Sequence, residues 1–323
     1  MPKPDSRYQH SFRYNIWVII FWSQLTDLGK YFMKPYRKPV ILRGLNIGIC
    51  KQKWSLEYLK ENAEDVDVKV HVTTEPNMSF IKKNFAYRSL KFKNFLNRII
   101  KSSNKEEFFF DQNELYYLRS LGDNARKDPA DIKKQFPSLA SDINFPPYFT
   151  DESFFSSVFR ISSPGIRLWT HYDIMDNLLI QVTGTKDVTL FSPADSRYLY
   201  MDGDKSAVLD IENPDLYEFP KFSKAIPHKC TLLPGDVLFI PALWFHNVIS
   251  HSISVAVNVF WRHLPQEMYD KKDPYGNKDL LLATESFRHL DKALKCIDSL
   301  PEPYKQFYCT RMIETCKKKL QNI

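Results

Sequence analysis

The sequence is poor in cysteine, and its few cysteines are not spaced as a disulfide framework or a zinc site requires. Cys50, Cys230, Cys296, Cys309 and Cys316 are widely scattered among the 323 residues, and no Cys-x-x-Cys pair occurs. An odd number of isolated cysteines argues against a disulfide-stapled secreted domain and against a structural zinc site. We therefore expect reduced thiols in an intracellular protein, either cytoplasmic or nuclear.

Long hydrophobic runs are also missing. The one candidate for a targeting or membrane segment, Tyr14–Trp22, is far shorter than the ~20 apolar residues that span a bilayer. Residues 23–27 offer no small-residue cleavage site for a signal peptidase. We interpret the run as a packed or surface segment, expect no membrane partner, and assign no role to the N-terminal extension of residues 1–24.

Neither repeats nor low-complexity tracts occur, and the charge imbalance is modest. Hydrophobic residues make up 43% and aromatic residues 15% of the chain, which predicts that most of it is folded. The formal net charge is +7, from 45 Lys and Arg against 38 Asp and Glu. This excess favours a polyanionic partner over a neutral one, but on composition alone ordinary solubility charge is the preferred explanation.

Short strands separated by glycine and proline turns dominate the middle of the chain. We expect strands at residues 36–44, 66–72, 114–119, 154–162, 166–173, 177–182, 186–191, 236–240 and 253–261, and helices at 54–60, 94–105 and 128–136. This order predicts a mainly β fold with added helices, in which the strands form a barrel or two packed sheets. His71 falls on the polar face of its strand, so we expect it to be solvated.

Two amphipathic helices are predicted after Leu264. Apolar residues recur at helical spacing at Phe287, Leu290, Leu294 and Ile297, and again at Cys309, Ile313, Cys316 and Leu320. The helices either cover the β core or form a homodimer interface, and the sequence does not choose between these roles. We divide the chain into the extension 1–24, a catalytic domain at 25–263 and a helical segment at 264–323.

A possible metal site lies in the strand region. His171 and Asp173 are two residues apart, so on a strand they project to one face. His246 follows 73 residues after Asp173 and must come from another strand or its loop. Two imidazoles and one carboxylate are the facial ligand set of non-haem Fe(II) oxygenases, which leaves positions open for substrate and O2. Unrelated structural residues are the less favoured explanation, since each lies inside a longer motif.

The open positions of such a site suit a chelating acid such as 2-oxoglutarate, whose distal carboxylate needs a cation. Lys186 follows His171 by 15 residues, across a turn at Gly184 that we expect to return it beside the strand of His171. A lysine inside an apolar barrel needs an anion, although a turn lysine pointing to water is the simpler alternative. Tyr117, Asn177 and Asn258 are candidates for neutral hydrogen bonds to the same acid.

These motifs resemble the JmjC-domain Fe(II)/2-oxoglutarate dioxygenases. The resemblance is carried by His171-Tyr172-Asp173-Ile174-Met175-Asp176-Asn177, by Lys186, and by the run from Gly235 to His246. Aspartate in the carboxylate position is typical of the hydroxylases of that family. Further stretches, at residues 37–39, 116–120, 154–160 and 275–278, are similar to the branch that hydroxylates the wybutosine base beside the anticodon of tRNA(Phe). The similarity extends from about residue 25 to the C-terminus.

The resemblance implies a cupin-like double-stranded β-helix, or jelly roll, with tRNA(Phe) and O2 as substrates. It implies Fe(II) held by the catalytic residues His171, Asp173 and His246. It also implies 2-oxoglutarate bound by Lys186 with help from Tyr117, Asn177 and Asn258. Related hydroxylases often place a co-substrate-binding threonine three residues before the first histidine. Leu168 occupies that position here, so the hydrogen bond must come from elsewhere, for example from Tyr117.

Support for RNA from the residues alone is limited. Between Lys82 and Lys101, basic residues alternate with Phe85, Tyr87, Phe92 and Phe95, a mixture suited to phosphate contact and base stacking. Solvated helix faces over packed aromatics are the structural alternative. Two other functions stay open: hydroxylation of a protein side chain in the same fold, and a non-catalytic RNA-binding or partner-binding module. The complete ligand set argues against the second.

Overall fold

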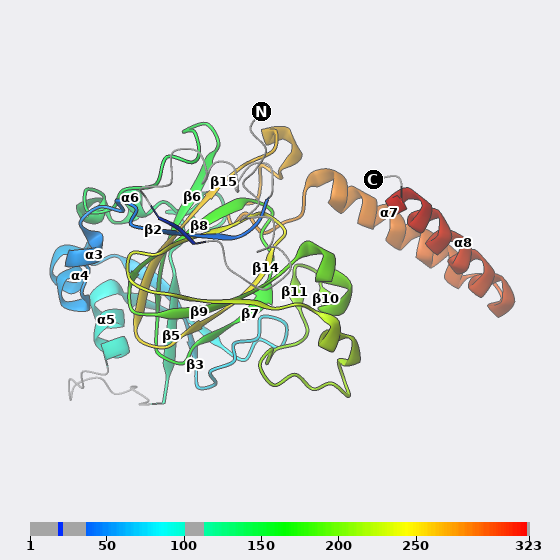
Figure 1. Cartoon of the computed structure of the whole chain (residues 1–323), viewed down its shortest axis with the longest axis horizontal. Helices are drawn as coiled ribbons and strands as arrows, with labels where there is room; N and C mark the ends of the chain where they lie inside the picture. The colour runs from blue at the N-terminus through cyan, green and yellow to red at the C-terminus, as the bar shows by residue number, and fades with distance from the viewer. Residues whose placement is uncertain (1–18, 22–36, 101–112, 322–323) are drawn as a thin grey trace. The chain divides into compact units, whose positions relative to one another are not determined.

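The computed structural model describes residues 19–21, 37–100 and 113–321 (Figure 1). Most of the apolar run Tyr14–Trp22, the rest of the extension 1–24, and the end of the helix predicted at 94–105 lie outside the described residues. The chain divides into two compact units. The first comprises residues up to Leu264 together with Lys271–Lys278, and the second comprises Pro265–Asp270 and the residues from Asp279 onward.

The first unit is built on two sheets, with every described strand pair antiparallel except β1 and β2. In spatial order, the larger sheet contains β1 (Ile19–Phe21), β2 (Val40–Arg43), β13 (Val237–Ile240), β8 (Asp176–Thr183), β15 (Ser254–Trp261), β6 (Phe154–Ser162), β5 (Leu115–Arg119), β3 (Asp67–Thr73) and β4 (Ala86–Lys91). The smaller sheet contains β10 (Met201–Asp202), β11 (Lys205–Ser206), β7 (Arg167–His171), β14 (Phe245–Ser250), β9 (Lys186–Phe191) and β12 (His228–Leu232).

The two sheets face each other across an apolar layer. Leu179, Leu238 and Ala256 of the larger sheet pack with Val188 and Leu190 of the smaller sheet in one buried cluster. Because side chains alternate across a strand, the residues between these positions point to the opposite face of each sheet. This arrangement is a sandwich of two packed sheets, and it confirms the predicted fold class.

Short helices cover the outer face of the larger sheet (Figure 1). They are α3 (Cys50–Lys53), α4 (Leu56–Asn62), α5 (Phe92–Ile100) and α6 (Ile132–Gln135). Helix α4 begins two residues later than the predicted 54–60, because the Ser55 side chain caps it by accepting a hydrogen bond from the Tyr58 backbone N–H. Phe92, Phe95 and Phe136 of this layer are buried with Phe159 of β6.

Some predicted boundaries were wrong. The helix expected at 128–136 is shorter, because Asp131 caps it and α6 covers only Ile132–Gln135. The strand expected at 166–173 ends at His171. Strands β4, β12 and β14 were not predicted at all.

The turn between β8 and β9 carries the chain from the larger sheet to the smaller one. Gly184 occupies it with φ +76°, and an added Cβ would lie 2.3 Å from the carbonyl oxygen of Ile253. Only glycine is suited to this left-handed conformation and close backbone approach. Strand β9 therefore pairs with β14 and β12, and the expectation that Lys186 returns beside the strand of His171 was wrong.

The second unit contains α7 (Leu281–Asp298) and α8 (Glu302–Gln321), which confirms the two predicted C-terminal helices. Phe287 of α7 is 60% exposed, and Leu290 and Leu294 are also exposed. Among the helices of the described residues, none combines the length and the apolar content that crossing a bilayer requires.

Candidate metal centre

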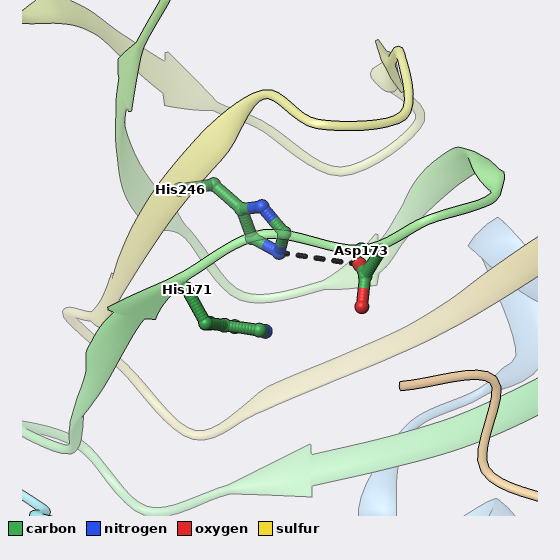
Figure 2. Close-up of side chains that lie close together, drawn as sticks. All are labelled: His171, Asp173 and His246. Carbon is green, nitrogen blue, oxygen red and sulfur yellow. Dashed lines mark ion pairs between the residues drawn. The ribbon is translucent and has the colours of Figure 1, made fainter. Parts of the chain in front are cut away.

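His171, Asp173 and His246 lie together inside the first unit (Figure 2). One ligand atom from each residue lies within 4.8 Å of the other two. The backbone brings them together because His246, in β14, is the register partner of His171, the last residue of β7. Asp173 lies in the loop two residues beyond this strand end, and one of its oxygens is 3.6 Å from Nε2 of His246.

Both imidazoles are oriented in the same way, with Nδ1 directed at a backbone carbonyl oxygen. Nδ1 of His171 is 3.0 Å from the Trp169 carbonyl oxygen, and Nδ1 of His246 is 3.1 Å from the Trp244 carbonyl oxygen. Since a carbonyl can only accept, each Nδ1 carries the proton and each Nε2 keeps its lone pair. Burial, and then the neighbouring His246, lowers the pKa of His171 well below its ordinary value. The ring is therefore neutral, as a metal ligand must be.

The loop that carries Asp173 is tied to the residues just before β14, the strand that carries His246. The Leu243 N–H donates to the Asp173 carbonyl oxygen at 2.8 Å, and Leu243 has φ +70°. One residue earlier, the Ala242 N–H donates to the Asp176 carboxylate at 3.0 Å. These bonds join the start of β14 to the loop after β7, so the spacing of the donors depends on the backbone as well as on the side chains.

A cavity of about 360 Å³ opens beside the three donors. His171 and Asp173 line it together with Tyr117, Arg119, Arg160 and Trp169. Aromatic rings gather along one wall, where Trp169 stacks on Phe85 with their planes 16° apart. An apolar, ring-lined wall beside a group of metal-ligand type is suited to a flat organic substrate.

Lys186 is buried at the start of β9, with 4% of its surface exposed. Its ammonium group makes no ion pair within 4.0 Å with any carboxylate of the described residues. Burial, and then the positive charge of Arg160, lowers the pKa of Lys186 to about 7. The structure thus places Lys186 in the interior, away from the solvent that the simpler alternative assumed.

The neutral candidates are also inside. Asn258 Nδ2 donates to Asn177 Oδ1 at 3.0 Å, while Asn177 Nδ2 and Asn258 Oδ1 are buried without a partner. Tyr117 lines the cavity and accepts a hydrogen bond from Arg160. Leu168, at the position where related hydroxylases carry threonine, packs among apolar side chains.

Three cavity residues were missed or misread from the sequence. His71 is not solvated as predicted: it is 8% exposed, lines the cavity and has its Nδ1 3.2 Å from the Tyr117 carbonyl oxygen. Burial lowers the pKa of His71 to about 4. Arg119 and Arg160 also line the cavity. The sequence did contain a sign that Arg160 faces the cavity. It lies between the apolar residues Phe159 and Ile161, which are buried on one face, so its side chain must project from the other face of the sheet.

The aromatics of the 82–101 segment divide into two groups. Phe92 and Phe95 are fully buried in the outer layer, so the structural alternative holds for them. Tyr87 is 50% exposed and lines the cavity, and Phe85 packs against it. Lys82, Lys83 and Lys91 are exposed on the same segment.

The chain is similar to a known family of domains and to named proteins within it. Residues 32–267 match the cupin-like domain model, which covers more than half of this chain. The chain is also 57% identical over 279 residues to tRNA wybutosine-synthesizing protein 5 of Homo sapiens, covering 86% of this chain and 88% of that protein. The Danio rerio protein of the same name is 56% identical over 279 residues, covering 86% of this chain and 85% of that one.

A longer relative matches through only part of its length. The tRNA wybutosine-synthesizing protein 4 of Neurospora crassa is 35% identical over 296 residues, which are 87% of this chain and 23% of that protein. The chain belongs to the cupin-like family of tRNA wybutosine-synthesizing protein 5. The resemblance inferred from the motifs is thereby confirmed.

Proposed function

We propose that this protein is an Fe(II)- and 2-oxoglutarate-dependent dioxygenase that hydroxylates the wybutosine base beside the anticodon of tRNA(Phe). One observation carries the proposal: two histidines and an aspartate of facial-ligand type converge beside a cavity, in a chain of this family. A module that only binds RNA would have no need for a carboxylate beside two histidines whose Nε2 atoms are free for coordination.

His171, Asp173 and His246 would hold the metal, and the donor chemistry fits Fe(II). When bound, Fe(II) and 2-oxoglutarate supply the activation of O2 and the insertion of oxygen into a C–H bond, with succinate and CO2 as the other products. The residues of the chain position these groups and the substrate. The backbone carbonyls of Trp169 and Trp244 fix the imidazole tautomers, and the ring-lined wall orients the base and excludes water.

Lys186 is the residue we assign to the distal carboxylate of 2-oxoglutarate. A buried ammonium without a carboxylate partner is costly, and a dicarboxylate would remove that cost. Arg160 adds a second cation nearby, and Tyr117 contributes its hydroxyl. These two groups replace the hydrogen bond that Leu168 cannot make. Asn177 and Asn258 retain unpartnered polar atoms and complete the proposed co-substrate site.

We assign RNA contact to the segment that borders the cavity. Tyr87 offers an exposed ring at the cavity wall, and Lys82, Lys83 and Lys91 offer charge. Rings stack on bases and lysines neutralise phosphates, so this combination favours RNA over a protein side chain. The free cysteines are consistent with a reducing compartment, and we assign the protein to the cytoplasm or nucleus.

The test is direct. Purified protein is incubated with Fe(II), 2-oxoglutarate and wybutosine-containing tRNA(Phe), and the digested nucleosides are analysed by mass spectrometry. The wybutosine nucleoside should gain one oxygen atom, and the Asp173→Ala variant should produce no gain. If succinate forms while the nucleoside mass is unchanged, the substrate is not this base, and hydroxylation of a protein becomes the better explanation.

We further propose that α7 and α8 mediate a homodimer. Phe287, Leu290 and Leu294 form one stripe of α7, and all three are exposed in the single chain. A second copy would bury this stripe, as isologous interfaces do. Light scattering should give twice the chain mass for the wild type and one chain mass for Phe287→Glu with Leu294→Glu. A wild-type protein that is monomeric at micromolar concentration would contradict the assignment.

A further inference from the structure

Two arginines face each other across neighbouring strands in the cavity wall. Arg119 of β5 is the register partner of Arg160 of β6, and both line the cavity. Side chains of register partners project to the same face of a sheet. Like charges placed directly opposite each other destabilise a strand pair, so this arrangement needs a physical reason.

Neither arginine makes an ion pair with a carboxylate within the described part of the chain, although the negative charge of Asp173 opposes the lowering of the Arg119 pKa. Arg160 donates to the Tyr117 hydroxyl, and its Nε is buried without a partner. Arg119 donates to the Tyr275 carbonyl oxygen at 3.3 Å, which is a weak bond. Burial, and then Arg160, lowers the pKa of Arg119 to about 10, so Arg119 stays charged at neutral pH.

A third cation of the cavity, unlike the two arginines, has a carboxylate partner. Lys205 also lines the cavity, and its ammonium group is paired with Asp204. The protein therefore pairs this cation with a carboxylate while Arg119 and Arg160 have none. A cavity wall with two such guanidinium groups is built for an anion that the chain does not itself supply.

Arg119 is contacted by residues Lys271–Lys278, which follow the last strand and belong to the first unit. Its guanidinium carbon lies 5.1 Å from the ring centroid of Tyr275. The Asp273 carboxylate fixes this segment by accepting hydrogen bonds from the N–H groups of Tyr275, Gly276 and Lys278. A guanidinium stacked on a ring keeps its planar edge available for a two-oxygen anion.

The charge continues toward solvent on the next strand. Lys69 of β3 also lines the cavity, is exposed, and has its ammonium group 4.5 Å from the ring centroid of Tyr87. Arg160 lies on the interior side, where its charge acts on Lys186. Arg119 thus lies between the proposed co-substrate site and the exposed wall of the cavity.

We propose that Arg119 binds an anionic group of the nucleotide substrate inside the cavity, either a carboxylate on the base or a phosphate of the backbone. The assignment rests on the proposed function and adds to it a residue that selects the substrate. Both anions present two oxygens to one guanidinium, which explains why arginine rather than lysine occupies the position.

Arg119→Met removes the charge and keeps most of the apolar length, and Arg119→Lys keeps the charge without the planar fork. We expect kcat/KM for tRNA(Phe) to fall roughly 10- to 100-fold in Arg119→Met, as losing a charged hydrogen bond does. Arg119→Lys should fall between Arg119→Met and the wild type. The KM for 2-oxoglutarate and succinate formation without RNA should be unchanged. Arg126→Met, an exposed arginine, serves as the charge-matched control. Wild-type kcat/KM for tRNA in Arg119→Met, or a raised KM for 2-oxoglutarate instead, would overturn the assignment.

The free wybutosine nucleoside and the anticodon stem-loop fragment distinguish the two anions. If Arg119→Met impairs turnover of both, the anion is on the base; if it impairs only the fragment, the anion is a phosphate. Inorganic phosphate gives a readout that does not need turnover. It should raise the melting temperature of the wild type and not that of Arg119→Met, even if no tRNA product ever forms. A wild-type protein that phosphate does not stabilise would count against the site itself and not against the proposed function.

Discussion

Replacing Lys186 with methionine should make the ligand-free protein more stable and the enzyme less able to bind its co-substrate. The lysine is 4% exposed and has no carboxylate partner among the described residues. Its pKa, lowered from 10.5 to about 7, corresponds to roughly 5 kcal/mol of destabilisation when both folded and unfolded states carry the proton. Methionine has a similar length and no charge, so it avoids this cost.

The pH dependence has a definite sign. Between pH 7 and 10.5 the unfolded chain keeps the Lys186 proton and the folded chain has lost it, so the unfolded state binds more protons. The free energy of unfolding must therefore rise with pH across this window, and below the folded-state pKa the full penalty is present. In Lys186→Met the contribution of this residue to the slope disappears.

The assay is urea unfolding of metal-free wild type and variant at pH 7 and pH 10. The variant should be more stable at pH 7, and the difference should shrink toward pH 10. Adding 2-oxoglutarate and metal at about 100 times the dissociation constant should stabilise the wild type by about 2.7 kcal/mol and the variant hardly at all. Lys229→Met, at an exposed position on β12, is the control. A Lys186→Met protein that is less stable at pH 7 would refute the claim that the buried charge is a cost.

Three further outcomes are expected. His246→Ala should abolish hydroxylation and weaken metal binding measured by calorimetry, and a variant with retained turnover would contradict the ligand assignment. Gly276→Ala should cost about 1 kcal/mol of stability or more, because φ is +70° and the new Cβ would lie 2.7 Å from the Phe155 ring; wild-type stability in urea unfolding would contradict it. Affinity for tRNA should fall steeply and log-linearly with salt concentration in a filter-binding assay, whereas a flat salt response would favour a protein substrate.

The strands that were predicted correctly share a clear local signal. β6 and β9 have the predicted bounds, because each is a β-rich run ended by a glycine or proline turn. β14 was missed although it carries His246: all six residues are buried, so no alternation marks it. β4 was missed for the opposite reason, since it is an edge strand with no buried residue. Alternation reports one buried face. β13 and β15 are also buried throughout and were predicted from their β-rich composition, which β14 signals less clearly.

In the site, too, residues whose placement depends on local geometry were predicted and residues whose placement depends on the tertiary fold were not. The spacing of His171 and Asp173 placed two donors together because it depends only on local geometry, although Asp173 lies just past the strand end. The surroundings of Lys186 depend on which sheet β9 joins, and that choice is made by the tertiary path at Gly184. Arg119 and His71 were missed because a charged or polar residue in a strand is normally solvated. Only the second sheet, facing them across the cavity, makes these positions internal.

The interior charges explain one another when they are considered together. Lys186, Arg160 and Arg119 bring positive charge to the interior face of the first unit, and among the described residues none of the three makes an ion pair with a carboxylate. Lys186 is buried and the two arginines are partly exposed. Packing alone would favour apolar residues at such positions, because unpaired charge that is removed from water destabilises a fold. The cost makes sense if the anions come from outside: each bound anion then gains the full attraction of charges that are already desolvated and fixed in place. The same desolvated charges lower the stability of the ligand-free protein and raise its affinity for anions. A variant that removes one of them should therefore be more stable and bind its anion more weakly.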